Sequence, residues 1–402
     1  MKPTKIVLAP DKFKGTLSAH EVAGALAEGL REELPDAELV LVPVADGGEG
    51  TVSAALGAGF LPRRARVSGP TGQPLTADFA VHPESGRAVV EMAAASGLDV
   101  LPGGVRDARN ATSLGTGQLV RAALDAGARH IILGVGGSAC TDGGAGMLQG
   151  LGARFTDDGG NELPLGGAAL ARLAEADLSA LDARLDTTTL VLAADVDNPL
   201  LGERGAAAVF GPQKGATPQD VSDLDAALTR FAGVLGAALG PKAAAAKEAP
   251  GAGAAGGVGY ATLAVGAQRR RGIDVVVDFT GLREKLAGAA LVITGEGSLD
   301  AQSLAGKAPV GVAAEARAQG VPVIAVCGRT QLDAAARAAA GFSAVHALTD
   351  LEPDVEVCLR DARRLVRDAG RLIGQQLKAG GLAGTSGGLT NVDTHSRKES
   401  VR

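Results

Sequence analysis

Short apolar runs that end in polar, glycine-rich loops constrain the fold of this chain more than any other feature. Glycine makes up 59 of the 402 residues, about double its usual share of roughly 7%. The glycines gather where strand-like runs end, and a chain can turn tightly or let a ligand approach its backbone at such points. Five polar loops after such runs carry at least one carboxylate, at residues 11–16, 46–51, 136–144, 195–199 and 295–300, and all but 195–199 contain glycine.

The two ends of the chain share one order of predicted elements. A strand over residues 5–9 precedes a helix that begins at a capping box of Ser18 and Glu21, and a second strand covers 38–44. Three more strands alternate with helices towards the C-terminus, at residues 291–294, 321–327 and 344–349. A single long helix is expected over 354–378. Alternation of helices with nearly continuous apolar strands predicts a doubly wound parallel sheet.

The middle of the chain has a different pattern. Residues 75–81 and 87–92 flank a Pro-Glu-Ser-Gly turn and predict a hairpin, and αβ units follow it. We therefore expect a mixed sheet here. The Ala- and Gly-rich stretch 241–259 is expected to be a flexible connection leading into a helix.

These patterns predict an α/β fold with two domains. The first is a discontinuous domain made from both chain ends, residues 1–70 and 285–379, with a doubly wound parallel sheet. The second is an inserted α/β domain with a mixed sheet, residues 71–284. Residues 380–402 lack apolar periodicity, so we expect a disordered tail.

Composition excludes several function classes. The chain has a net charge of −6 and 2% aromatic residues with no Trp, which argues against a nucleic-acid binder. It has no apolar run of about 18 residues and no signal-peptide core, so we expect a cytoplasmic protein without membrane contact. The three cysteines have no metal-ligand spacing.

Familiar phosphate and hydrolase motifs do not fit. Gly306-Lys307 has Ala301 where a P-loop needs its first glycine. A G-x-G-x-x-G at residues 251–256 follows an Ala-rich stretch rather than a strand, so it lacks the context of a dinucleotide site. Ser138 follows glycines without forming G-x-S-x-G, and no His lies in a glycine loop.

The five loops instead fit the handling of a magnesium-bound nucleotide. Backbone N–H groups at helix starts bind phosphate, whereas carboxylates repel it unless a divalent cation intervenes. Phosphoryl transfer needs positioning, charge neutralisation and a carboxylate that accepts a proton. Lys14, Lys214 and Lys307 are the available cations. For each loop alone, a tight turn with a helix-capping Asp remains an alternative, as does a solvated surface lysine for each cation.

At these loops the sequence resembles the type-1 bacterial glycerate kinases. The matching segments occur in the family's order and cover about residues 5–378: they are 8–19, 45–51, 91–98, 111–117, 134–147, 195–202, 210–215, 294–300 and 306–309. The resemblance implies phosphorylation of D-glycerate with ATP and Mg²⁺, and a flavodoxin-like domain with an inserted one. It implies 2-phosphoglycerate as product, with the 3-phosphate left open. Cys140-Thr141 departs from the family pattern, where a small residue and Asn are expected.

The resemblance also implies roles for the loop residues. Asp195 or Asp197 would be the general base or a magnesium ligand, while Lys14 and Lys214 would hold the glycerate carboxylate or stabilise the transferring phosphoryl group. Candidates for binding the metal or ribose are Asp46, Glu49, Glu296 and Asp300. Backbone donors for phosphate would be Gly47, Gly48, Gly136, Gly137, Ser138 and Gly295. Further candidates for binding substrate or nucleotide are Asp11, Thr116, Asp142, Asn198, Gln213 and Ser298.

Two alternative functions stay open at this level. One is a kinase for another small hydroxy acid. The other is a non-catalytic sensor that binds a nucleotide or a carboxylic acid, although so many carboxylates are unfavourable for simple anion binding. The sequence also leaves open whether the chain forms a homodimer.

Overall fold

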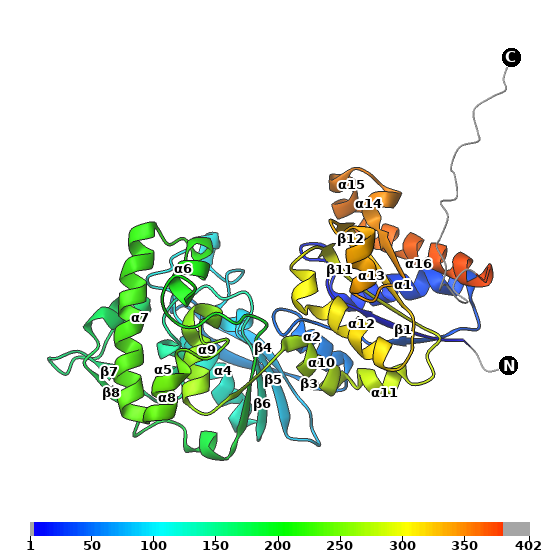
Figure 1. The fold of residues 1–402 in the computed structure, drawn as a ribbon. Coiled ribbons are helices and arrows are strands. Elements are labelled where there is room, and N and C mark those ends of the chain that lie inside the picture. The colour runs from blue at the N-terminus through cyan, green and yellow to red at the C-terminus, as the bar shows by residue number, and fades with distance from the viewer. Residues whose placement is uncertain (1–3, 381–402) are drawn as a thin grey trace.

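The computed structural model describes residues 4–380 and contains two large β-sheets, each covered by helices (Figure 1). A hairpin-like pair, β7 (Arg154–Thr156) and β8 (Glu175–Asp177), forms a small third sheet. Within residues 4–380, no helix is both long enough and apolar enough to cross a membrane.

The first sheet is built from both ends of the chain. Its strands are all parallel and lie in the order β13-β12-β11-β1-β2. Their bounds are β1 (Lys5–Pro10), β2 (Glu38–Leu41), β11 (Leu291–Leu299), β12 (Val323–Thr330) and β13 (Ala344–Ala347). Counted within this sheet, the order is 2-1-3-4-5, which is the flavodoxin-like arrangement.

The second sheet is mixed, with the order β10-β9-β6-β5-β4-β3. The pairs from β10 to β5 are parallel, and β4 pairs antiparallel with both β5 and β3. The strand bounds are β3 (Leu61–Ser68), β4 (Pro74–Val81), β5 (Arg87–Glu91), β6 (His130–Gly134), β9 (Thr189–Ala193) and β10 (Gln268–Arg270). The hairpin predicted over 75–92 is confirmed as β4 and β5.

Helices cover both faces of each sheet. The outer face of the parallel sheet packs on α1 (Ala19–Glu33) and α16 (Ala362–Lys378), and the outer face of the mixed sheet packs on α4 (Leu114–Asp125), α5 (Ala145–Gly150), α7 (Pro218–Leu239) and α9 (Val258–Ala264). The remaining helices are α2 (Thr51–Gly57), α3 (Ala93–Ser96), α6 (Ala206–Phe210), α8 (Pro241–Ala246), α10 (Gly272–Thr280), α11 (Leu282–Leu286), α12 (Ala308–Ala318), α13 (Ala334–Ala339), α14 (Leu348–Leu351) and α15 (Val355–Arg360).

The two sheets share one hydrophobic core. Successive strand residues point to opposite faces, so Ile6 and Leu8 of β1 pack towards α1, while Val7 faces the other way. The core that contains Val7 also contains Val89 and Val191 of the mixed sheet, together with side chains of α2 and α10. These two helices lie between the sheets (Figure 1). The two units are therefore joined by packed apolar side chains.

The predicted fold class is confirmed: a flavodoxin-like parallel sheet is made from both chain ends, and an α/β unit with a mixed sheet is inserted into it. The domain limits near residues 70 and 285 stay a prediction. Strand β3 pairs with β4 along its length, so a first limit before Leu61 agrees better with the hydrogen bonding than one at residue 70.

Two local expectations were wrong. The stretch 241–259 is not a flexible connection, because α8 begins at Pro241 and residues 252–259 are buried. The helix expected over 354–378 is two helices, since Asp361 between α15 and α16 has non-helical backbone angles. The tail predicted over 380–402 lies almost entirely outside the described residues.

Candidate functional site

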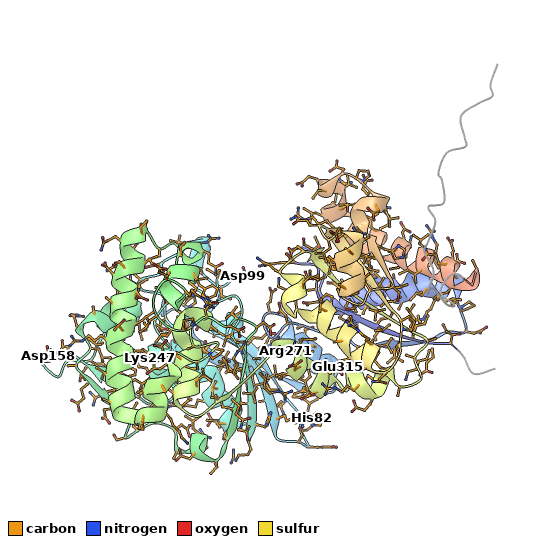
Figure 2. All side chains as sticks on the ribbon, viewed as in Figure 1. His82, Asp99, Asp158, Lys247, Arg271 and Glu315 are labelled. Atoms are coloured by element: carbon orange, nitrogen blue, oxygen red, sulfur yellow. The ribbon has the colours of Figure 1, made fainter. Side chains whose placement is uncertain are left out.

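A cavity of about 640 Å³ opens at the carboxyl ends of β1 and β11. These neighbouring strands mark the point where the strand order of the parallel sheet reverses, and ligands bind at such points in open α/β sheets. The mixed-sheet unit contributes Ala93, Leu98, Asp99, Gly136 and Gly137 to the lining. Asp99 lies on the side of that unit that faces the parallel sheet (Figure 2).

Asp11 is the most buried carboxylate in this cavity. It directly follows β1, its backbone N–H donates to the carbonyl oxygen of Gly295 at 2.8 Å, and its Oδ1 accepts from the N–H of Lys12 at 2.6 Å. The side chain lines the cavity although the residue is only 6% exposed. Burial raises the pKa of Asp11 to about 7; Lys12 opposes this rise, and Asp46 and Glu296 add to it. A carboxyl group in this position can exchange a proton near neutral pH.

Glu296 and Ser298 present buried polar atoms without partners to the same cavity. Both residues lie on β11 and line the cavity. Within the described part of the chain, Glu296 Oε1 and Ser298 Oγ have no hydrogen-bond partner. Burial raises the pKa of Glu296, Ser303 and Lys307 oppose the rise, and Asp300 and Asp46 add to it. Buried polar atoms are normally paired, so two unpaired ones facing a cavity indicate a ligand site.

The four residues predicted to bind metal or ribose all line the cavity. They are Asp46, Glu49, Glu296 and Asp300. Asp46 Oδ1 accepts from the N–H of Gly48 at 3.2 Å, and Asp300 Oδ1 accepts from the N–H of Gln302 at 2.8 Å. Among residues 4–380, no three His, Cys, Asp or Glu side chains converge closely enough to hold a metal ion by themselves.

Four cationic side chains also line the cavity. They are Lys12, Lys14, Lys307 and Arg329. In the part of the chain that the structure describes, none of them forms an ion pair with a carboxylate, although Lys12 Nζ donates to the carbonyl oxygen of Glu49. The arrangement therefore offers positive charge for an anionic ligand beside the carboxylates.

The predicted phosphate-binding glycines divide into two groups. Gly48, Gly136 and Gly137 line the cavity. Gly47 and Gly295 do not line it, and both are closely packed: a Cβ on Gly47 would lie 2.6 Å from the Cα of Gly272, and one on Gly295 would lie 1.8 Å from the carbonyl oxygen of Val326. Ser138 is buried and lies outside the cavity lining.

The residues first expected as general base are not in the cavity lining. Asp195 Oδ1 accepts from the N–H of Gly272 at 2.8 Å, and burial raises the pKa of Asp195 to about 6. Asp197 is exposed and pairs with Arg269 at 2.6 Å. Asn198 Nδ2 donates to the carbonyl oxygen of Arg204 at 2.8 Å. The structure gives these side chains partners within the mixed-sheet unit.

Lys214, expected to bind substrate or phosphate, lies inside the mixed-sheet unit. It is 1% exposed, and its Nζ donates to the carbonyl oxygen of Cys140 at 2.6 Å. Burial lowers the pKa of Lys214, with Cys140 and Asp142 opposing. Lys214 belongs to a loop bounded by Gly211, Pro212 and Gly215. Loops of this composition are often exposed, and the sequence pattern therefore predicted an exposed turn that binds phosphate. The neighbouring Gln213 is exposed and does not line the cavity.

Two more predicted ligand residues have structural partners. The buried Asp142 accepts hydrogen bonds from the N–H of Ser113 at 2.7 Å and from its hydroxyl at 2.9 Å. Thr116 donates its hydroxyl hydrogen to Ser96 Oγ at 2.9 Å. These contacts fix the loop after β6, which places Gly136 and Gly137 at the cavity.

The sequence reasoning did not assign four residues at or near the site. Lys12 belongs to the first glycine loop and could have been found there. Arg329 and Asp99 lie in segments without glycine motifs, so no pattern marked them. Glu91 ends β5, and its Oε1 accepts from the N–H of Val52 at 2.6 Å, at the start of α2. Burial raises the pKa of Glu91 to about 6, against the effects of this hydrogen bond and of Lys12.

Comparisons with known proteins agree on one family. The model of the glycerate kinase family matches residues 6–378. A protein named glycerate 2-kinase from Escherichia coli (strain K12) is 44% identical over 94% of this chain and 98% of its own length. A glycerate kinase from Bacillus subtilis (strain 168) is 45% identical over 90% of this chain and 96% of its own.

A solved structure gives the same result. The crystal structure of a protein assigned as glycerate kinase 2 from Salmonella typhimurium LT2 matches with a TM-score of 0.82 and 45% identity, covering 94% of this chain and 99% of the other. Family model, relatives and solved structure all match nearly the whole chain, and the range of the family model includes every loop that lines the cavity. The chain belongs to the glycerate kinase family.

Proposed function

We propose that this protein transfers the γ-phosphoryl group of ATP to the 2-hydroxyl of D-glycerate, giving 2-phosphoglycerate and ADP. The observation that carries the proposal is the cavity at the carboxyl ends of β1 and β11. It combines a buried carboxylate, Asp11, with partnerless polar atoms on Glu296 and Ser298 and with four cationic side chains. Membership of the glycerate kinase family supports the choice of substrate.

Asp11 replaces Asp195 and Asp197 as the proposed general base. In the proposed step, the 2-hydroxyl oxygen attacks the γ-phosphorus, the bond from that phosphorus to the β–γ bridging oxygen breaks, and ADP leaves. The hydroxyl proton passes to the carboxylate of Asp11. Phosphoryl transfer relies mainly on positioning and on neutralising charge. Removal of this proton adds a further contribution of about 10²- to 10⁴-fold in rate.

The cations and glycines have complementary tasks in this proposal. Lys14, Lys307 and Arg329 neutralise the phosphates or hold the glycerate carboxylate, since no carboxylate of the described chain pairs with them. Gly136 and Gly137 line the cavity from the mixed-sheet unit, and their backbone N–H groups would donate to phosphate. Phosphate would thereby contact both units, and this supports closure around the substrates, which would keep water out of the reaction.

The carboxylates of the cavity fit Mg²⁺. Proteins usually hold this ion through one or two carboxylates together with substrate phosphates, rather than through a complete protein cage. Glu296, with its partnerless Oε1, and Asp46 would hold the ion together with the phosphates. When bound, the ion neutralises charge on the phosphate oxygens.

A coupled assay tests both the activity and the position of transfer. The purified protein is incubated with ATP, Mg²⁺ and D-glycerate, and enolase is added without phosphoglycerate mutase. We expect absorbance from phosphoenolpyruvate, because enolase accepts the 2-phosphate and not the 3-phosphate. ADP release that depends on glycerate but gives no phosphoenolpyruvate would move transfer to the 3-hydroxyl. No glycerate-dependent ADP would contradict the proposal.

Location and assembly stay predictions. We expect the protein to act in the cytoplasm, where ATP and small hydroxy acids are available. A homodimer is the assembly to test first, by light scattering with and without nucleotide.

A further inference from the structure

One face of α15 forms an apolar wall in the cavity. Val355, Cys358 and Leu359 of α15 line the cavity and are spaced i, i+3 and i+4, so they share one side of this helix. Ala362, the first residue of α16, also lines the cavity. Leu348 of α14 extends this wall. The core of the parallel-sheet unit lies behind it, where Leu348 is 1% and Ala362 4% exposed.

The front of this wall is half-exposed. Val355 is 47% and Leu359 48% exposed, although both are large apolar side chains. Other described residues leave about half of each one uncovered, and both residues line the same cavity as the carboxylates and cations. An apolar surface that continues into a charged site is typical of a ligand pocket with an apolar and a polar end.

We propose that the apolar wall of Leu348, Val355, Cys358 and Leu359 is the subsite for the purine base of the nucleotide. The inference rests on the proposed function, and it names the part of the cavity that recognises the base. A nucleotide has a flat apolar base at one end and a multiply charged phosphate chain at the other. The cavity lining combines both kinds of surface, the apolar wall and the charged side chains of Arg329 and Lys307.

Glycerate does not match the wall. It is small, carries a carboxylate and two hydroxyl groups, and gains little from apolar contact. A purine ring buries far more apolar surface, and about 25 cal/mol is gained for each Å² removed from water. Thr349 lines the cavity beside Leu348 and offers a hydroxyl group that can donate to or accept from a ring nitrogen.

Polar substitutions on the wall test the proposal. Val355→Gln, Leu359→Gln and the double variant keep side-chain size but remove the apolar surface. We expect the KM for ATP to rise about tenfold in the double variant, because two half-exposed side chains each lose part of their burial energy. The KM for glycerate should stay at the wild-type value. The inhibition constant of adenosine should rise with the KM for ATP, while that of tripolyphosphate should not change.

Two matched controls test whether replacing any exposed apolar side chain by Gln raises the KM for ATP. Val209 is a valine on the short helix α6, 45% exposed and outside the cavity lining. Leu351 is a leucine on α14, 41% exposed and also outside it. Val209→Gln and Leu351→Gln should leave the KM for ATP unchanged.

Each alternative outcome has a distinct meaning. An unchanged KM for ATP and an unchanged adenosine inhibition constant in the double variant would overturn the subsite. Equal effects of Leu351→Gln and Leu359→Gln, with a lower molecular mass by light scattering, would also overturn it and show an association surface between copies. If the wild type makes no phosphoglycerate but binds adenosine by calorimetry, and the double variant weakens this binding tenfold, the proposed function fails while the subsite is supported.

Discussion

Asp195 Oδ1 accepts a hydrogen bond from the backbone N–H of Gly272 at 2.8 Å. Asp195 follows β9 of the mixed sheet, and Gly272 begins α10, which lies between the two sheets (Figure 1). A Cβ on Gly272 would lie 1.9 Å from the carbonyl oxygen of Asp46, which belongs to the cavity. The two units and the candidate site therefore meet at this glycine.

Substitution of Asp195 should affect stability more than catalysis. Asp195→Ala removes the acceptor for the first N–H of α10, and we expect a loss of about 1 kcal/mol in the free energy of unfolding, as for other helix caps. Asp195→Asn keeps an oxygen acceptor and should stay close to wild type. Denaturant unfolding and kcat are measured for both variants. A kcat loss of 100-fold or more in a fully folded Asp195→Asn protein would contradict the structural role and indicate that Asp195 is the general base.

Gly272→Ala should disrupt the junction of the two units. The added methyl group collides with the backbone at Asp46, so either α10 or the loop at Asp46 must move, and both the unfolding temperature and kcat should fall. Gly24→Ala is the matched control: Gly24 lies inside α1, and a Cβ added there would have no neighbouring atom within 4 Å. That control should gain about 0.5–1 kcal/mol from helix propensity. Similar behaviour of both variants would contradict the close contact at Gly272.

Lys214→Met tests whether Lys214 acts on substrate. Methionine fills a similar volume but leaves the buried carbonyl of Cys140 without its donor, which costs about 1–3 kcal/mol. We expect this loss in the free energy of unfolding and only a moderate loss of kcat/KM in the folded protein. Lys14→Met, which removes a cation lining the cavity, should show the reverse pattern. A thousandfold loss of kcat with unchanged stability in Lys214→Met would place its ammonium at the reacting atoms.

Glu91 should make stability depend on pH. Burial raises its pKa from 4.5 to about 6 in the folded protein, so the unfolded chain releases this proton first as pH rises. The stability of the wild type relative to Glu91→Gln therefore falls between about pH 4.5 and 6, by about 2 kcal/mol in total, and is constant above that range. Gln keeps an oxygen for the N–H of Val52. Denaturant unfolding of both proteins across this pH range measures the difference in the free energy of unfolding. A difference that does not change with pH would contradict the raised pKa of Glu91.

Local patterns predicted much of the fold. The Ser18–Glu21 capping box forms, and the strand expected over 5–9 is β1, which extends to Pro10. Apolar runs located most strands because buried parallel strands are nearly continuously apolar. The apolar pattern did not predict β3, because this strand carries Arg63, Arg64 and Arg66 and is mostly exposed to solvent. Its strand conformation is defined by its pairing with β4.

The site was predictable at the level of loops more than of individual side chains. Loops after β1, β2, β6 and β11 do meet at one cavity, as the carboxyl ends of strands should. Which side chain of a loop faces the cavity depends on backbone packing between the units. Asp11 faces it, whereas Asp197 turns to Arg269 and Lys214 turns inwards to Cys140. No sequence spacing encodes these choices.

The most direct test of the account is kcat for glycerate-dependent ADP release in Asp11→Asn, with Asp197→Asn as the control. Both changes replace a carboxylate by an amide of the same shape, one inside the cavity and one outside it. The account predicts that Asp11→Asn lowers kcat by about 10²- to 10⁴-fold without loss of ATP binding, and that Asp197→Asn behaves as wild type. Wild-type kcat in Asp11→Asn, or an equal loss in Asp197→Asn, would contradict it.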